Sequence, residues 1–81
     1  MMNNLEKLTQ AFENSTSIPR PMIHDTLSYG VEGWDSVAHM SLIAEIESAF
    51  DIMMDTDDVI SMSSFGKAKE ILNKYGIEFK S

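Results

Sequence analysis

Three residues with the chemistry of a nucleophilic site stand close together in the middle of the chain. Asp35 and Ser36 are adjacent, and His39 follows about one helical turn later. A carboxylate, a hydroxyl and an imidazole can act together in ester hydrolysis. Hydrolysis also needs an oxyanion hole and a pocket that excludes water, and the sequence indicates neither. A hydrolase therefore ranks behind the alternatives below; it predicts turnover of simple esters by the unmodified protein and loss of that turnover in His39→Ala.

These residues belong to the start of a predicted helix over residues 36–50. At about 100° per residue, one arc of this helix gathers its large apolar side chains and predicts the face that packs on the core. That arc holds His39, Leu42, Ile43, Ile46, Ala49 and Phe50. The opposite arc holds Ser41, Glu45 and Ser48, flanked by Val37, Ala38 and Ala44. Small and apolar side chains on the solvent side of the helix start are typical of a face that docks a partner.

Asp35 and Ser36 both suit the N-cap of this helix, because a short side-chain oxygen there accepts hydrogen bonds from free N–H groups of the first turn. A cap alone would explain either residue. The surrounding pattern is more specific, and it includes Trp34, which we expect to be exposed. Gly33, Trp34, Asp35, Ser36 and Val37 are followed by Leu42, Glu47, Phe50, Asp51 and Ile52.

This pattern resembles the signature of the acyl carrier and peptidyl carrier proteins, in which a Gly-x-Asp-Ser-Leu motif opens the second helix. The resemblance covers nearly the whole chain. It implies that Ser36 carries 4'-phosphopantetheine, which a phosphopantetheinyl transferase takes from coenzyme A, and that Asp35 helps the transferase to recognise the serine. The phosphate would lie at a helix N-terminus, where free N–H groups and the helix dipole favour an anion. The thiol of the arm would supply thioester chemistry to a chain without cysteine.

The implied function is to hold acyl or aminoacyl groups as thioesters and to present them to partner enzymes, with no catalysis by the chain itself. The implied partners are the transferase, an acyl- or aminoacyl-loading ligase and downstream biosynthetic enzymes with basic docking patches. We expect the docking face to comprise Val37, Met40, Ala44, Glu45, Glu47 and Met54. Val37 replaces the usual Leu, and Ala38 and Ser41 replace frequent acidic residues. Trp34 and the run Ala38-His39-Met40 look more like stand-alone carriers of polysaccharide or secondary-metabolite pathways than like the housekeeping fatty-acid form.

Charge and composition favour a small interaction domain. The 81 residues suffice for one domain, residues 1–81, and provide no cysteine for disulfides or thiolate metal sites. Between Arg20 and Lys67 there are nine acidic residues and no Lys or Arg, within a net charge of −7. Such a surface repels nucleic acid and anionic membranes and attracts basic protein patches. Without a leader pattern or an apolar run of roughly 18 residues, we expect a cytoplasmic monomer. The second hypothesis is an acidic helical adaptor without a prosthetic group, in which Ser36 is only a cap.

The overall pattern predicts an all-α fold, a small four-helix bundle with a long first loop and a short third helix, and the carrier resemblance implies the same order. Further helices are predicted over residues 3–14, over about 57–62, and from a cap at Ser63 or Ser64 to about Tyr75, with Gly76 just beyond. Seven methionines adapt to irregular gaps, which suggests the hypothesis that the bundle partly encloses an acyl chain.

The loop over residues 15–35 is predicted to fold back on the bundle. Its expected apolar anchors are Ile18, Met22, Ile23, Leu27, Tyr29 and Val31. Gly30 and Gly33 suit positions with positive φ. His24 is interpreted as a plain surface histidine. The acidic residues near 55–58 do not fit a calcium loop, because Ile60 and Gly66 occupy the positions that require glycine and glutamate.

Overall fold

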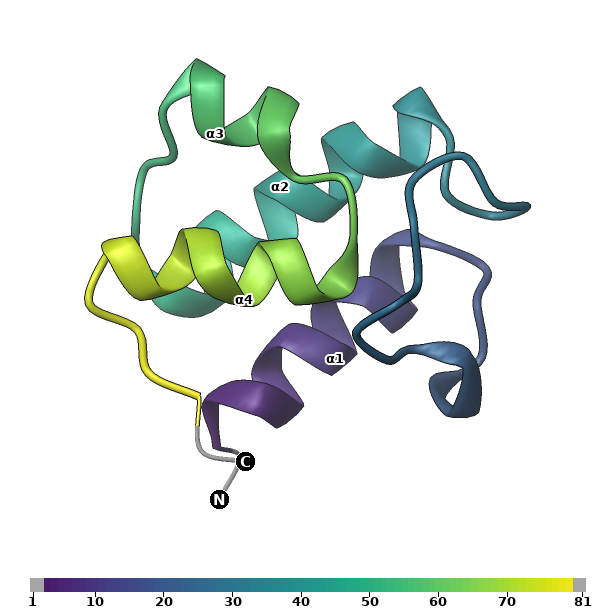
Figure 1. The fold of residues 1–81 in the computed structure, drawn as a ribbon, viewed down its shortest axis with the longest axis horizontal. Helices are drawn as coiled ribbons and strands as arrows, with labels where there is room; N and C mark the ends of the chain where they lie inside the picture. The colour runs from purple at the N-terminus through teal and green to yellow at the C-terminus, as the bar shows by residue number, and fades with distance from the viewer. Residues whose placement is uncertain (1–2, 80–81) are drawn as a thin grey trace.

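The computed structural model describes residues 3–79, which fold into four α-helices (Figure 1). They are α1 (Asn4–Ser15), α2 (Ser36–Phe50), α3 (Thr56–Ser61) and α4 (Phe65–Lys74). A short 3-10 turn, η1 (Arg20–Met22), lies in the long first connection and is not anticipated by the sequence pattern. Within residues 3–79 the only extended pairing is a single bridge between Ser28 and Ser64. The predicted all-α class is confirmed, and each predicted helix boundary lies within one residue of the observed one.

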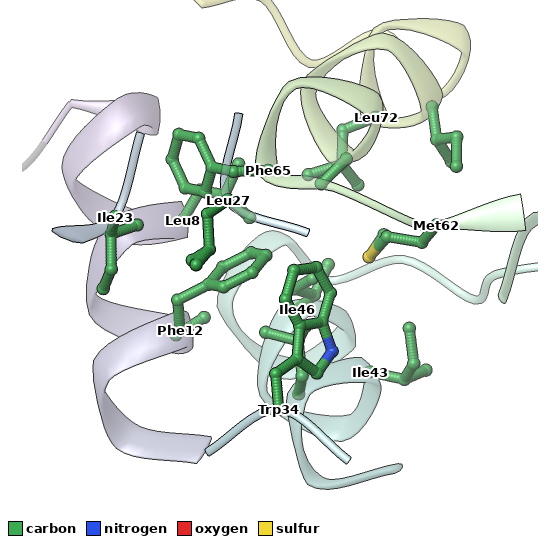
Figure 2. Close-up of a cluster of buried hydrophobic side chains, with 14 of the residues drawn as sticks. Leu8, Phe12, Ile23, Leu27, Trp34, Ile43, Ile46, Met62, Phe65 and Leu72 are labelled. Atoms are coloured by element: carbon green, nitrogen blue, oxygen red, sulfur yellow. The ribbon is translucent and has the colours of Figure 1, made fainter. Parts of the chain in front are cut away.

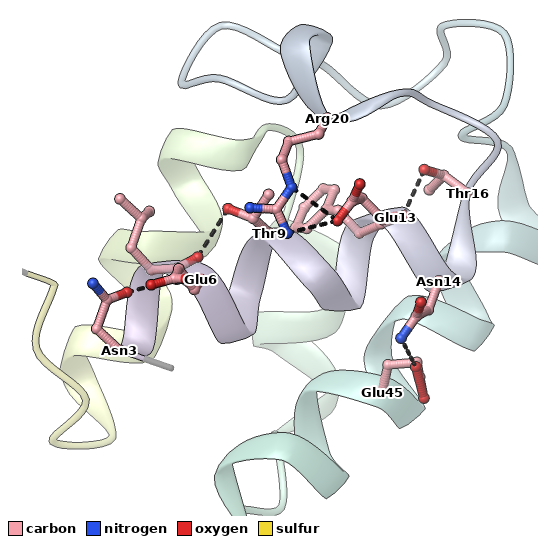
Figure 3. A network of polar contacts seen from close by, with 10 residues as sticks. Asn3, Glu6, Thr9, Glu13, Asn14, Thr16, Arg20 and Glu45 are labelled. Atoms are coloured by element: carbon pink, nitrogen blue, oxygen red, sulfur yellow. Dashed lines mark hydrogen bonds and ion pairs between the residues drawn. The ribbon is translucent and has the colours of Figure 1, made fainter. Parts of the chain in front are cut away.

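Local side-chain signals set most of these boundaries. The Asn3 side-chain oxygen accepts the Glu6 N–H at 2.8 Å at the start of α1 (Figure 3), and Ser64 Oγ accepts the Lys67 N–H at 3.0 Å at the start of α4. Helix α4 ends just before Gly76, whose φ of 85° suits the predicted position beyond the helix. Helices α1, α2 and α4 therefore begin at a side-chain N-cap, whereas Asp55 makes no such bond at the start of α3.

Trp34 lies at the centre of the core, so the prediction of an exposed indole is wrong. Its side chain has no exposed surface, and Figure 2 shows it beside Phe12 and Ile46, among side chains from α1 and α2. The Phe12 ring meets the indole edge-on at a centroid distance of 5.1 Å. Because Trp34 immediately precedes the N-cap of α2, the returning loop carries the indole inward, where it closes the bundle.

Helices α1 and α2 pack through most of their predicted apolar residues, and α4 covers the same core. The buried side chains on these helices include Leu8, Ala11, Phe12, Leu42, Ile43, Ile46, Phe65, Ala68, Ile71 and Leu72. Ala49 is an exception, because it was predicted in the core and is exposed. It falls at the edge of the apolar arc and lines a groove with Lys7 and Gln10 of α1. The partly buried Ile77 and Phe79 pack back on the core as a C-terminal tail.

The first loop folds back over the bundle as predicted, but only half of its expected anchors are buried. Ile18, Ile23 and Leu27 are buried, whereas Met22, Tyr29 and Val31 are exposed. The prediction was wrong for the latter three because apolar character in an aperiodic segment does not fix which side chains point inward. Main-chain hydrogen bonds contribute the remaining attachment to the bundle.

The middle of the loop, residues 25–29, is attached to the start of α4. The Tyr29 N–H donates to the Ser63 carbonyl, and the Phe65 N–H donates to the Leu27 carbonyl, each at 2.9 Å. The Gly66 N–H donates to the Asp25 carbonyl at 3.1 Å, and a Cβ on Gly66 would lie 3.1 Å from that same oxygen. A glycine at this position therefore allows the loop and the helix to approach closely.

A line of polar contacts fixes α1 to its surroundings (Figure 3). The Arg20 guanidinium donates to Glu13 Oε1 at 2.8 Å, and this hydrogen bond raises the pKa of Arg20 above its ordinary value. The Asn14 side-chain amide donates to Glu45 Oε1 at 3.2 Å and so links α1 to α2. These contacts are largely exposed, so we assign them to orientation of the helices rather than to most of the stability.

Candidate functional site

Ser36 is the first residue of α2, and Asp35 is its N-cap. Asp35 Oδ1 accepts the Ala38 N–H at 2.9 Å, and the Asp35 carbonyl accepts the His39 N–H at 2.8 Å. Of the two residues that the sequence allowed as the cap, the structure selects Asp35. Ser36 is exposed and is not needed as a cap, so its hydroxyl is accessible at the positive end of the helix dipole.

A pocket of about 300 Å³ opens beside Ser36 between α2, α3 and the residues that flank them. Most of its lining is apolar or aromatic, and none of the lining side chains is a carboxylate, lysine or arginine. It is lined by Tyr29, Ser36, His39, Met40, Val59, Ile60, Met62 and Ser63. Met62 is almost fully buried and therefore lies at the inner end, whereas the Ser36 and Ser63 hydroxyls supply polar groups.

His39 connects three segments around this pocket. The Trp34 indole N–H donates to His39 Nδ1 at 3.0 Å, so Nδ1 is unprotonated and the proton resides on Nε2. The Nε2–H then donates to the Val59 carbonyl at 2.9 Å. Both ring nitrogens are engaged, which leaves no lone pair for the Ser36 hydroxyl. The Asp35, Ser36 and His39 cluster therefore lacks the contact between base and nucleophile that a hydrolase requires.

Large apolar side chains surround the pocket on the surface. Val37, Met40 and Ile60 are 74%, 69% and 75% exposed, respectively. Val37 and Met40 were predicted as docking residues, and Ala44 lies on the same stripe of α2 and is exposed. Val37, Met40 and Ala44 therefore occupy one surface of α2 with Ser36.

The other three predicted docking residues are placed differently. Glu47 is half-buried, and its Oε2 accepts the Met54 N–H at 2.9 Å, which braces the connection from α2 to α3. Met54 is half-buried and packs against the core. Glu45 faces α1 through its hydrogen bond with Asn14, on the side of α2 away from the pocket. Within α2 the structure thus separates Glu45, which faces α1, from Val37, Met40 and Ala44, whereas Met54 lies in the connection between α2 and α3.

Helix α3 is tied to α4 through Asp58, one of the nine acidic residues that were expected to form an acidic surface. Asp58 is buried at 7% exposure, and it accepts hydrogen bonds from Lys74 Nζ at 2.6 Å and from Tyr75 Oη at 2.5 Å. The bond from Lys74, followed by the bond from Tyr75, lowers the pKa of Asp58. The same contacts raise the pKa of Lys74 and the pKa of Tyr75. Tyr75 Oη also accepts the Asp55 N–H at 3.0 Å, so both ends of the first turn of α3 are held.

Several pocket residues are absent from the sequence-based site. Tyr29, Val59, Ile60 and Ser63 come from the loop, from α3 and from the segment after it. The sequence does contain one signal for this wall of the pocket, the adjacent apolar residues Val59 and Ile60 in a short helix. Adjacent helical residues point in different directions, so both side chains cannot be buried against the same neighbour. Another hollow, of about 520 Å³, lies beside the ion pair of Asp25 and Lys69 and contains none of the predicted site residues.

His24, which was interpreted as a plain surface histidine, is exposed and contacts the Thr26 hydroxyl through Nδ1 at 2.9 Å. Among residues 3–79, no three side chains of the kinds that ligate metals come together in a potential metal site. In that same range, no helix is both long enough and apolar enough to span a bilayer. No family model matches the chain, and no curated protein or solved structure matches it either.

Proposed function

We propose that this chain is a phosphopantetheine-dependent acyl carrier, a four-helix bundle of the carrier type in which Ser36 bears the arm. One observation carries the proposal: an exposed serine begins α2 directly beside an apolar pocket of about 300 Å³. A serine that only capped the helix would not need this position, because Asp35 already supplies the cap. The chain acts as a carrier rather than as a catalyst.

The residues around Ser36 suit a phosphate on its hydroxyl. The N–H groups of Ser36 and Val37 lie in the first turn, where the helix offers no carbonyl partner, and the helix dipole favours an anion there. The Asp35 carboxylate accepts the Ala38 N–H, and this hydrogen bond holds the carboxylate against the first turn of α2. When bound, the arm supplies a thiol that holds the acyl group as a thioester. The chain contains no cysteine that would compete with it.

The pocket favours an acyl group over a charged aminoacyl group. Its lining offers no carboxylate to balance an ammonium, and both nitrogens of His39 are already engaged. Burying an unpaired charge costs far more free energy than burying an alkyl chain. At about 300 Å³ the pocket has twice the volume of an engineered cavity in another protein, of about 150 Å³, that admits benzene, so it has room for part of an alkyl chain.

Charge supports basic partners for this surface. No Lys or Arg occurs between Arg20 and Lys67, the span that contains Ser36, α2 and α3. Exposed Val37, Met40 and Ile60 provide an apolar contact within that acidic field. We therefore propose docking of a transferase, a loading ligase and downstream enzymes through basic patches, in the cytoplasm, and no association with nucleic acid or membranes.

The test is intact-protein mass before and after incubation with coenzyme A and a broad-specificity phosphopantetheinyl transferase. We expect one phosphopantetheinyl increment on the parent chain and none on Ser36→Ala. Ser41→Ala is the matched control, because Ser41 is also an exposed serine of α2 but does not line the pocket. It is expected to be modified as fully as the parent.

Absence of the increment would overturn the proposal, provided that the parent sample carries none beforehand and that the transferase modifies another carrier in parallel. That result would favour the second function, an acidic adaptor, with which the exposed apolar residues beside the pocket are also consistent. An adaptor predicts that binding of its partner survives Ser36→Ala. Modification of Ser36→Ala at another serine would likewise contradict the assignment of the site.

A further inference from the structure

Helix α3 is too short to hold its own position. It contains only six residues, and isolated helices below about 12 residues are marginal in water. Its place beside the pocket is therefore decided by contacts with the rest of the chain. Asp58 ties it to α4, and the Glu47 carboxylate braces the chain just before it. Neither of these side chains lines the pocket.

The contact between His39 and Val59 is different, because both residues line the pocket. The Val59 carbonyl belongs to the last turns of α3, where carbonyls lack partners within the helix. His39 Nε2–H therefore satisfies a free carbonyl of α3 from the opposite wall of the pocket. This hydrogen bond links α2 to α3 across the pocket.

The orientation of His39 is set in turn by Trp34. The indole N–H is fully buried with Trp34 and must have an acceptor, because an unsatisfied buried donor is costly. Its acceptor is Nδ1, which forces the proton onto Nε2 and aims it at Val59. The Trp34 and His39 rings also lie nearly parallel, with centroids 6.0 Å apart. The core thus selects the tautomer that holds α3.

We propose that His39 is a positioning residue that sets the width of the pocket beside Ser36 by linking the buried Trp34 to the Val59 carbonyl of α3. The consequence for cargo rests on the proposed carrier function. Loss of the Val59 bond loosens α3 and weakens enclosure of an acyl chain, whereas attachment of the arm to Ser36 is unaffected.

Two conservative variants separate the two hydrogen bonds of His39. In His39→Gln the side-chain amide nitrogen can reach the position of Nε2 and keep the bond to Val59. In His39→Asn the shorter side chain retains an acceptor near Nδ1 for Trp34 but cannot reach α3. A purely structural role in the core would make His39→Gln, which removes the acceptor for the buried indole, the more disruptive change.

The first measurements use the unmodified protein and do not depend on carrier function. Nitrogen NMR is expected to show the neutral Nε2–H tautomer of His39, with coupling across the hydrogen bond from Trp34 Nε1 to His39 Nδ1. Amide exchange in α3 is expected to be about fivefold to tenfold faster in His39→Asn, the factor that a single hydrogen bond supplies, and near the parent rate in His39→Gln. An Nδ1–H tautomer, or equal exchange in the two variants, would overturn the proposal.

The second measurement loads the parent and both variants with an octanoyl-pantetheine arm. The Met40 and Met62 methyl resonances are expected to shift between the thiol and octanoyl forms in the parent and in His39→Gln, and several-fold less in His39→Asn. Equal shifts in all three proteins would refute the effect on cargo. If the parent accepts no arm, the proposed function fails, whereas the exchange comparison still decides the role of His39.

Discussion

The division of labour between Asp35 and Ser36 yields a sharp prediction about stability. The Asp35 carboxylate accepts the Ala38 N–H at 2.9 Å, whereas Ser36 is an exposed residue inside the first turn and caps nothing. Asp35→Ala therefore removes a capping bond, and Ser36→Ala does not. Asp35→Asn is the matched control, because asparagine caps as well as aspartate without the charge.

The expected magnitudes differ enough to be measured. Loss of an N-cap side chain costs about 1 kcal/mol, within a range of about 0.5 to 2 kcal/mol, whereas an exposed substitution away from such features stays within about 0.5 kcal/mol. A chain of 81 residues has a free energy of unfolding of about 4 to 12 kcal/mol, so both variants should fold. A loss of 1 kcal/mol lowers Tm by about 4 to 8 °C in a domain of this size.

Urea denaturation followed by tryptophan fluorescence is the suitable assay. Trp34 is the only tryptophan and is fully buried, so its emission reports on the folded core without competing signals. We expect Asp35→Ala to lower the midpoint at an unchanged m-value, Asp35→Asn to recover most of the loss and Ser36→Ala to match the parent. A Ser36→Ala midpoint as low as that of Asp35→Ala would refute the assignment of the cap. If Ser36→Ala is as stable as the parent, its failure to accept a phosphopantetheine arm could not be attributed to unfolding.

Two further predictions concern the loop and α3. Gly30 and Gly33 have φ of 101° and 97°, so alanine at either position should lower the urea midpoint. The midpoint should fall further for Gly33→Ala, because its Cβ would lie 3.2 Å from a neighbouring side chain. Equal losses in the two variants would contradict this prediction. Asp58→Asn should lower the midpoint at neutral pH. Because the pKa of Asp58 is lowered in the folded state, the difference in stability between parent and variant should be complete at pH values above the ordinary pKa of 3.8. It should vanish as the pH falls through the lowered pKa of the folded state. A difference that persists in acid would exclude the ion pair with Lys74 as its cause.

The helices could be predicted because their signals are local. Helical spacing of Leu8, Ala11 and Phe12, together with cap candidates at Asn3 or Asn4 and at Ser63 or Ser64, predicts where the chain turns helical, and the structure agrees to within one residue. The structure selects Asn3 and Ser64 as the caps. Such periodicity fixes which arc of a helix is apolar, although it leaves residues at the edge of the arc undecided, as Ala49 shows.

The placement of single residues outside the helices could not be predicted in the same way. Trp34 has no periodic neighbours, and its burial depends on how the loop closes over Phe12 and on an acceptor that His39 supplies from the next helix. The pocket has the same origin, since its walls come from a loop, from α2 and from α3, and their meeting is a tertiary event. Ser36 could be proposed from the sequence because its signal is a contiguous motif.

The three residues that first suggested a nucleophilic triad have three separate roles in the structure. The Asp35 carboxylate accepts a hydrogen bond from the Ala38 N–H, and the two ring nitrogens of His39 are hydrogen-bonded to Trp34 and Val59. Neither is left to activate Ser36. Ser36 is nevertheless exposed at the start of α2, beside the apolar pocket. A hydroxyl that its neighbours do not activate fits the proposed carrier function, in which the activating base would come from the proposed transferase.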